Sequence, residues 1–287
     1  MSGDEQALGG LLLVDKPPGM TSHDVVAWAR RTLGVRRIGH AGTLDPFASG
    51  LLPCCVGRAT RLVRFLHLWG KTYTGVIALG EETPTGDTES ATGLAPAPLP
   101  PAATIEAARR RLTGTYAQTP PAFSAKKIGG TPAHRLARRG GTPTLAPVRV
   151  TVHALRLERR PPGRLAFAAR VSTGTYLRTL ARDVGRICGT GGHLETLRRT
   201  SIGPMSAREA ASPGTDWDRE RLLTRLIVLE SIPLPIPRAI LDETSAQRFL
   251  HGQTVAAPGE PPPPGPLCVV DPAGRLLGIG EGGEPGR

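Results

Sequence analysis

Cysteine and aromatic residues are scarce in this chain of 287 residues, which has four cysteines and 4% aromatic residues. Cys54 and Cys55 are adjacent and Cys188 and Cys268 are isolated, so the sequence lacks the spacing of a zinc site or a redox C-x-x-C motif. The adjacent pair lies in an apolar run, where cysteine is typically a small buried residue. So little cysteine excludes a disulfide framework and favours a reducing cytoplasm.

Long apolar runs and cofactor signatures are also missing. The longest apolar runs are too short to cross a bilayer, and the acidic, polar N-terminus does not resemble a signal peptide. The glycines of 278–283 match a dinucleotide fingerprint only as a string, because no helix follows them. The stretch 65–72 has Phe65 where a P-loop has its first glycine. With H-E-x-x-H and G-x-S-x-G absent as well, we expect no membrane contact, no metal and no cofactor.

Acidic residues are outnumbered, and this imbalance is the first positive signal. The chain has 36 Lys and Arg against 24 Asp and Glu, a net charge of +12. Basic side chains release counterions from a phosphate backbone, so the excess favours a nucleic-acid partner. Solubility, or the Arg and Pro bias of a GC-rich genome, is the alternative explanation.

The hydrophobic pattern predicts short strands interleaved with amphipathic helices. Strands are expected at 10–14, 51–56, 71–79, 149–157 and 164–171. Helices are expected at 22–33 (with Ser22 as N-cap), 58–66, 105–112, 175–187 and 217–229.

Two further segments differ from this pattern. Residues 119–148 form a long basic stretch with interspersed glycine and proline, and we interpret it as an insertion that lies on a phosphate backbone. Beyond residue 232 the chain changes to proline-rich joints and short strands, such as 267–270 and 276–279. We therefore expect a small β-rich module at 232–287, following a main domain at 1–231.

The segment around Asp45 is the strongest candidate for chemistry. It reads Arg37-Ile-Gly-His-Ala-Gly-Thr-Leu-Asp45-Pro46 and lies between a predicted helix and a buried strand. Its glycines permit close approach of the backbone to a bulky ligand, and Pro46 fixes the bend. A loop carboxylate on a rigid scaffold suits catalysis, although an Asx turn before proline is the common structural explanation.

Five ordered motifs resemble the TruB family of pseudouridine synthases. They are the segments H-A-G-T-L-D-P at 40–46 with A-S-G-L-L at 48–52, G-L-L-L-V-D-K-P-P-G-M-T-S at 10–22, K-T-Y at 71–73 with Gly80 and Asp87, P-A-F-S-A-K-K at 121–127, and G-T-Y-L-R at 174–178 with 193–199. The resemblance covers nearly all of residues 10–205. It implies an α+β fold with a mixed, largely antiparallel sheet and a central cleft, followed by a PUA-like RNA-binding domain.

The resemblance also implies an activity, the isomerisation of uridine 55 in the T loop of tRNA to pseudouridine. The base would be flipped out of its stack and Asp45 would attack either ribose C1′ or base C6. The implied catalytic residues are Asp45, Tyr73 and Arg178. The implied substrate-binding residues are His40, Tyr176, Leu197, Lys16, Lys126 and Lys127.

Each implied role has a physical reason and a plainer alternative. Arg178 would keep Asp45 ionised, unless it is an ordinary exposed arginine on a helix. Tyr73 would stack on the flipped uracil, unless it is a half-buried strand tyrosine. His40 would fill the space that the base leaves or contact neighbouring bases, unless it is a satisfied structural histidine. Leu197 would wall the uracil pocket, unless it only packs in the core, and Tyr176 would pack behind the site.

Three other functions stay open at the level of sequence. A ribosomal RNA target would use the same aspartate, and guide-RNA-dependent synthases share these motifs, usually with longer termini. A non-catalytic protein that binds or folds RNA would have a similar composition. The tRNA substrate, a monomer and a cytoplasmic location are the expectations that we take forward.

Overall fold

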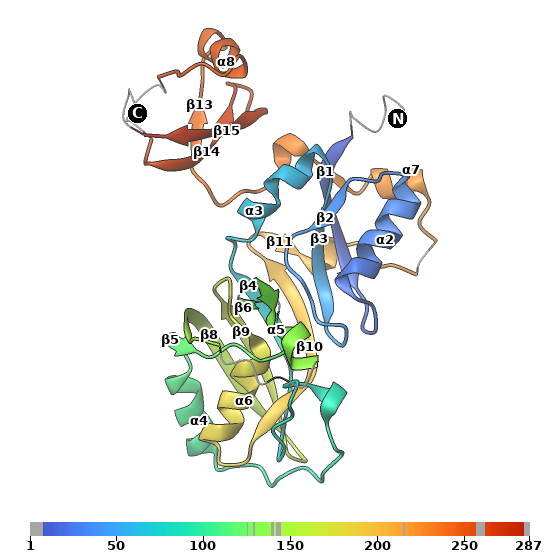
Figure 1. The fold of residues 1–287 in the computed structure, drawn as a ribbon, viewed down its shortest axis with the longest axis vertical. Coiled ribbons are helices and arrows are strands. Elements are labelled where there is room, and N and C mark those ends of the chain that lie inside the picture. The colour runs from blue at the N-terminus through green and yellow to red at the C-terminus, as the bar shows by residue number, and fades with distance from the viewer. Residues whose placement is uncertain are drawn as a thin grey trace.

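The computed structural model describes residues 8–124, 126–128, 130–138, 141, 145–214, 216–256 and 262–283. Within these residues, ten strands form one large sheet (Figure 1). They are β1 (Gly9–Lys16), β2 (Ile38–His40), β3 (Ser49–Gly57), β4 (Lys71–Leu79), β5 (Gly114–Gln118), β8 (Val148–Arg160), β9 (Arg164–Val171), β10 (Gly192–Ile202), β11 (Met205–Ser206) and β12 (Leu226–Val228).

Helices and smaller sheets complete the described part of the chain. The helices are α2 (Ser22–Leu33), α3 (Val63–Leu66), α4 (Ala102–Arg111), α5 (Ala133–Arg138), α6 (Leu177–Ile187), α7 (Arg219–Leu223) and α8 (Glu243–Leu250). The 3-10 turns are η1 (Arg58–Leu62), η2 (Thr88–Ser90), η3 (Ala207–Glu209) and η4 (Leu229–Ser231). The small sheets consist of β6 (Lys127–Ile128) with β7 (Thr131–Pro132), and of β13 (Arg238–Ile240), β14 (Gly265–Val270) and β15 (Leu276–Gly282).

The strand order of the large sheet is β12-β1-β3-β10-β4-β9-β8-β5. Strands β3 and β10 pair in parallel, whereas the other neighbours along this order pair antiparallel. This confirms the expected mixed, largely antiparallel sheet. The parallel contact joins two halves of the molecule, one built on β1 and β3 and the other on β4, β8, β9 and β10.

The half built on β1 and β3 buries both faces of its strands. Leu12 and Val14 pack against α2, while Leu11 and Leu13 pack on the other face, towards η1 and α3. Alternate residues of a strand point to opposite faces, so a continuous apolar run such as Leu11–Val14 is the pattern of a strand covered on both sides.

The other half has its own core, in which α6 and α4 cover one face of the sheet. Ile77 of β4, Phe167 of β9 and Leu194 of β10 meet Leu180 of α6 there. Helix α6 is strongly amphipathic: its apolar and small residues are buried, and its charged residues other than Arg178 are more exposed.

Most predicted elements are confirmed, and one is wrong. Helix α2 ends at Leu33 as predicted but begins one residue earlier than expected, because its N-cap is Thr21 rather than Ser22; β4 matches its predicted bounds. The predicted helix at 217–229 is an error, because only Arg219–Leu223 is helical and Leu226–Val228 is a strand. That strand, β12, pairs with the edge of β1, a contact that local periodicity does not reveal.

The basic insertion and the C-terminal module both contain regular structure. Within the insertion, β6, β7 and α5 form where a loop alone was expected, while residues 125, 129, 139–140 and 142–144 lie outside the described residues. In the module, the strands predicted at 267–270 and 276–279 are confirmed as β14 and β15. Its Leu276 and Ile279 pack against the core under α3, so the module rests on the half built on β1 and β3.

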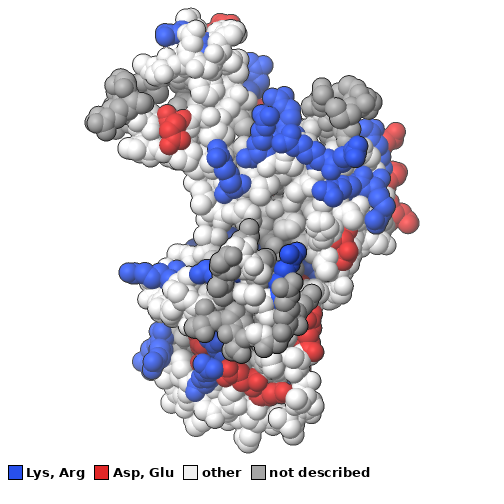
Figure 2. All heavy atoms as spheres, viewed as in Figure 1, with Lys and Arg blue, Asp and Glu red and all other residues white. Residues whose placement is uncertain are grey.

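The surface of the described residues is basic in places. Lys and Arg side chains gather over α3 and the C-terminal end of α2 (Figure 2). None of the helices that the structure describes is long and apolar enough to span a bilayer.

Gly50 is essential to the join between the two halves. Its φ is +103°, and a Cβ there would fall on the backbone oxygen of Arg199 across the parallel contact of β3 and β10. We expect Gly50→Ala to lower the free energy of unfolding by about 3 kcal/mol, because it combines a strained backbone with a steric clash. Urea denaturation measures this, with Gly39→Ala as the control, since a Cβ at Gly39 meets nothing within 4 Å. Equal stability of the two variants would contradict the prediction.

Candidate active site

Asp45 lies in the loop that joins β2 to β3, and buried side chains anchor this loop on both sides. Leu44 and Ala48 are buried in the core beneath α6. The Ser22 hydroxyl accepts a hydrogen bond from the Leu44 N–H (2.9 Å) and donates one to the Leu44 carbonyl (3.1 Å). The loop is thus held on both sides of Asp45, whose side chain remains 34% exposed.

Two buried cations support the same loop from below. Lys16 Nζ donates to the backbone carbonyls of Pro17, Met20 and Pro46 at 2.9, 2.6 and 3.1 Å. Arg199 donates to the carbonyl of Gly42 at 2.8 Å and to that of Leu51 at 2.7 Å. Burial lowers the pKa of Lys16 to about 8, an effect that the Asp45 charge opposes. Both cations therefore hold backbone and do not face outward.

Arg178 provides the direct partner of the Asp45 carboxylate. Its Nε lies 3.0 Å from Asp45 Oδ2 and its Nη2 lies 3.3 Å from Oδ1, so the guanidinium faces both oxygens. Arg178 is itself buried in the first turn of α6. The motifs predicted this pairing, and the geometry brings the two residues together.

Arg178 also contacts two backbone carbonyls and a second carboxylate. Its Nη1 donates to the Thr85 carbonyl and its Nη2 to the Phe123 carbonyl, both at 2.8 Å. Asp87, which is buried, has a carboxylate oxygen 4.0 Å from Nη1. The arginine therefore joins the Asp45 loop to the segment before η2 and to the start of the basic insertion.

The surroundings raise the pKa of Asp45 above its ordinary value. Burial is the largest cause, and the negative charge of Asp87 acts in the same direction. The charges of Arg178 and Lys16 oppose the rise. A solvated aspartate is ionised at neutral pH without a partner, whereas the buried Asp45 depends on the charge of Arg178 to stay ionised.

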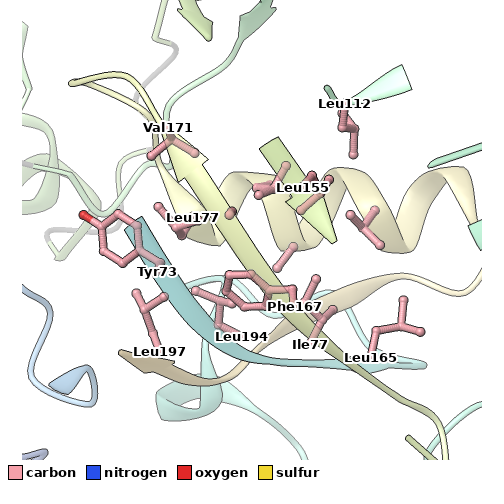
Figure 3. Close-up of a cluster of buried hydrophobic side chains, with 14 of the residues drawn as sticks. Tyr73, Ile77, Leu112, Leu155, Leu165, Phe167, Val171, Leu177, Leu194 and Leu197 are labelled. Atoms are coloured by element: carbon pink, nitrogen blue, oxygen red, sulfur yellow. The ribbon is translucent and has the colours of Figure 1, made fainter. Parts of the chain in front are cut away.

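A cluster of apolar side chains lies next to this pair. Tyr73 of β4 and Leu197 of β10 are both buried and belong to the same core cluster as Leu177, the residue before Arg178. Figure 3 shows the Tyr73 ring at the edge of this cluster, near Leu177 and Leu197, with its hydroxyl directed away from the other side chains. An aromatic face with a polar edge beside a carboxylate suits the binding of a planar, polar base.

His40 occupies β2, before the Asp45 loop, and is partly buried. Its Nδ1 is buried without a hydrogen-bond partner among the described residues. Burial lowers the pKa of His40, with further effects from His67 and Arg199, so the ring is neutral at neutral pH. A neutral imidazole has one nitrogen that donates and one that accepts, and the ring is partly exposed, so His40 suits contact with a nucleobase.

The remaining predicted residues have varied positions. Tyr176 is the N-cap of α6, and its backbone is bonded in both directions to the buried Gln118 side chain, at 2.8 Å and 3.2 Å. This fixes the start of the helix that carries Arg178. Lys126 is partly exposed in the insertion, whereas the side chain of Lys127 lies outside the described residues.

Three residues that support the site were not among the predicted site residues. Arg199 is fully buried; it belongs to the matched segment 193–199, but the resemblance gave it no role. Gln118 lies outside the matched motifs, and nothing in its local sequence indicates that it is buried. Asp87 had a signal, since it belongs to the motif after Gly80, and the structure places it at Arg178.

Lys16 differs from its predicted role as a substrate contact, because it is fully buried under the loop. We expect Lys16→Met to lower kcat about 10-fold or more while the KM for RNA stays within about twofold, since three carbonyls would be without their charged donor and the loop would shift. Steady-state kinetics separate the two parameters. A rise in KM alone, with kcat intact, would support the substrate contact instead.

The described residues contain no group of three or more His, Cys, Asp or Glu side chains that could hold a metal ion. The groups that they bring to the site are a carboxylate, its arginine, a tyrosine and a neutral histidine.

Comparison with solved structures identifies the fold. The chain aligns over 95% of its length with a chain of a Cbf5–Nop10–Gar1 complex (TM-score 0.72, 24% identity, 78% of that chain). It also aligns over 97% of its length with an H/ACA RNP bound to a substrate RNA containing 2′-deoxyuridine (TM-score 0.72, 23% identity, 79% of that chain). This is the pseudouridine synthase fold.

Comparison of sequences gives the family. Residues 30–177 match the N-terminal domain of TruB family pseudouridylate synthase, and 178–213 and 237–287 match two C-terminal domains of the same proteins. The chain is 42% identical to tRNA pseudouridine synthase B of Thermobifida fusca (95% of this chain, 94% of that protein). It is 41% identical to the protein of the same name from Burkholderia lata (95% and 86%). The chain belongs to the TruB family of pseudouridine synthases.

Proposed function

We propose that this protein isomerises uridine 55 in the T loop of tRNA to pseudouridine. The observation that carries the proposal is the Asp45 carboxylate, held by both oxygens against Arg178 beside an apolar wall of Tyr73 and Leu197. Relatives that share 38–42% of its residues over nearly its whole length are named tRNA pseudouridine synthase B.

The reaction needs a nucleophile or base and little else. The C1′–N1 bond of uridine breaks, the uracil turns, and a C1′–C5 bond forms while C5 loses a proton and N1 gains one. Atoms and electrons balance within the nucleotide, so no co-reactant is consumed. An ionised Asp45 begins the reaction at ribose C1′ or at base C6, and the target base must leave its stack to reach it.

The other residues have roles that follow from their positions. Arg178 keeps Asp45 ionised and oriented, and the Tyr73 ring stacks on the flipped uracil while Leu197 closes the pocket wall. His40, neutral and partly exposed, contacts the unstacked loop bases. Tyr176 supports the site from behind through the start of α6.

Catalysis and RNA binding are assigned to different parts of the chain. We assign catalysis to residues 1–231, with the T stem-loop gripped by the insertion at 119–148 through residues such as Lys126 and Lys127. Residues 232–287 form a second, PUA-like RNA-binding domain. Contacts to phosphates position the RNA, and unstacked loop bases supply the sequence to be read. The protein acts as a monomer in the cytoplasm, in keeping with its four free cysteines.

The test is incubation of the purified protein with an unmodified tRNA transcript, followed by mapping of pseudouridine at each position. Product at the T-loop uridine is the expected result. A ribosomal RNA fragment serves as the comparison substrate. Product in that fragment alone would overturn the tRNA assignment, and RNA binding without product in either substrate would favour a protein that binds or folds RNA.

A further inference from the structure

Acidic residues are almost absent from one long stretch of the chain. Between Val25 and Gly80, Asp45 is the only acidic residue, whereas the same stretch contains seven arginines and one lysine. Its net charge of +7 (eight cations less one anion) is more than half of the +12 of the whole chain. The function proposed above uses only Asp45 from this set, and most of the cations are left unexplained.

The fold brings the arginines of this stretch together on one surface. Strand β2 pairs with the end of β3, so Arg37 lies beside the start of η1, where its Nε donates to the Thr60 hydroxyl at 2.7 Å. Figure 2 shows the basic side chains gathered over α3 and the C-terminal end of α2. We call this surface the arginine belt. Its exposed members are Arg31, Arg37, Arg58, Arg61 and Arg64.

Among the described residues, these arginines have no carboxylate partner, whereas several arginines elsewhere in the molecule do. Arg164, Arg186 and Arg198, for example, are each paired with a glutamate or an aspartate. The ion pairs found among the described residues involve none of the five members of the belt. A cluster of arginines without counter-charges attracts a polyanion, and the planar guanidinium suits phosphate oxygens.

The part of the belt at the end of β3 lies well away from the reacting nucleotide. Strand β3 begins at Ser49, next to the Asp45 loop, and ends at Gly57, next to Arg58. The eight steps between its nine residues, at about 3.3 Å each, span about 26 Å. Arg58 is therefore out of reach of the flipped base, but within reach of a helix that extends from it.

The chemistry of the belt favours a duplex over a single strand. Proteins that hold single strands stack the bases on exposed aromatic side chains. Phe65, over which the Arg64 guanidinium lies at 4.6 Å, is buried and offers no such platform. Double-stranded RNA is bound through its phosphates and its shape, which require only well-placed cations.

We propose that the arginine belt binds the phosphate backbone of the RNA duplex that continues beyond the stem-loop in the active site. This inference rests on the proposed function, because it takes the stem-loop of tRNA as the part that reaches Asp45. The belt then distinguishes a complete tRNA from its isolated T arm. It does so through affinity, since the belt is remote from the reacting atoms.

The experiment compares two RNAs and two triple variants. The RNAs are a complete tRNA transcript and the T-arm stem-loop alone. The belt variant is Arg31→Gln/Arg58→Gln/Arg61→Gln. Its control is Arg156→Gln/Arg159→Gln/Arg160→Gln, which removes the same charge from exposed arginines of β8 in the other half of the molecule.

For the belt variant we expect the KM for complete tRNA to rise about 10-fold or more, with kcat unchanged. The slope of log affinity against log salt should fall by about 3, one for each arginine that no longer binds a phosphate. The KM for the stem-loop should stay within about twofold for both triple variants, and the control should retain the wild-type KM for tRNA.

Three results would overturn the inference. An equal loss of affinity for both RNAs would show that the belt binds the stem-loop itself. Unchanged affinity for both would show that the belt does not bind RNA and would favour a different partner, such as an acidic protein. An equal loss of affinity in the control would show that only overall charge matters. Conversion of the stem-loop by the wild-type protein is independent of the belt, so a failure there would count against the proposed function alone.

Discussion

Asp45→Asn should abolish pseudouridine formation while leaving RNA binding intact. We expect the single-turnover rate to fall by a factor on the order of 10⁴ or more, because the amide is not a nucleophile or a base. The amide oxygen still accepts a hydrogen bond from Arg178, and the shape of the side chain is preserved, so the loop should keep its position. The Kd for tRNA should change by no more than about threefold, as measured by filter binding beside the rate.

A matched control exists on helix α6. Asp183 is another partly buried aspartate whose carboxylate contacts an arginine, Arg182, and burial likewise raises its pKa. Asp183→Asn should therefore retain near-wild-type activity. Product formation by Asp45→Asn, or by a second variant, Asp45→Ala, would remove Asp45 from the chemistry whatever the control shows.

The local sequence pattern was sufficient to predict an element whose buried residues follow one regular period along the chain. The bounds of α2 follow from its apolar face, which includes Val25, Ala29 and Leu33, and the strand at 71–79 follows from its alternation. Local pattern failed at 217–229, where spaced apolar residues suit a helix but the chain leaves the helix to add a strand to β1. The free edge of a distant strand decides that outcome, and no local window contains it.

The reacting residues were predictable for a different reason than their supports. Asp45, Tyr73 and Arg178 occur in motifs of characteristic order, so a resemblance finds them. Arg199 and Gln118 act by donating to or bonding with backbone of remote segments, and such bonds depend on which segments the fold brings together. Arginine and glutamine are mostly exposed in proteins, so residue type alone predicts a surface position for both, whereas both are buried.

The supports share one physical task, which is to fix backbone around a charged centre. Lys16 and Arg199 each donate hydrogen bonds to backbone carbonyls around the Asp45 loop, and both side chains are fully buried. A buried cation is costly unless its donors are used, so these two residues hold the loop in one arrangement. The loop is therefore in place before RNA arrives.

Arg178→Lys should lower the single-turnover rate about 10²- to 10³-fold and should move its pH dependence. Lysine has a single ammonium in place of a fork that contacts both oxygens of Asp45 and the carbonyls of Thr85 and Phe123. Arg178 lowers the pKa of Asp45 both by its charge and by its hydrogen bonds; lysine keeps the charge but loses the two-point contact, so the pKa of Asp45 should rise further. Because the ionised form is the active one, the acid limb of the rate profile should shift to higher pH, and the defect should be greatest in acid.

Asp87→Asn provides the opposite shift and so tests the same electrostatic argument. The charge of Asp87 raises the pKa of Asp45, so its removal should move the acid limb to lower pH, even if the looser anchoring of Arg178 lowers the rate at all pH values. Rates measured under saturating enzyme in a pH series that begins near the ordinary pKa of an aspartate, about pH 4, and continues to about pH 9 follow the acid limb in both variants. Profiles of unchanged shape in both variants would mean that Arg178 acts only by holding the loop, and that the ionisation of Asp45 is set by burial.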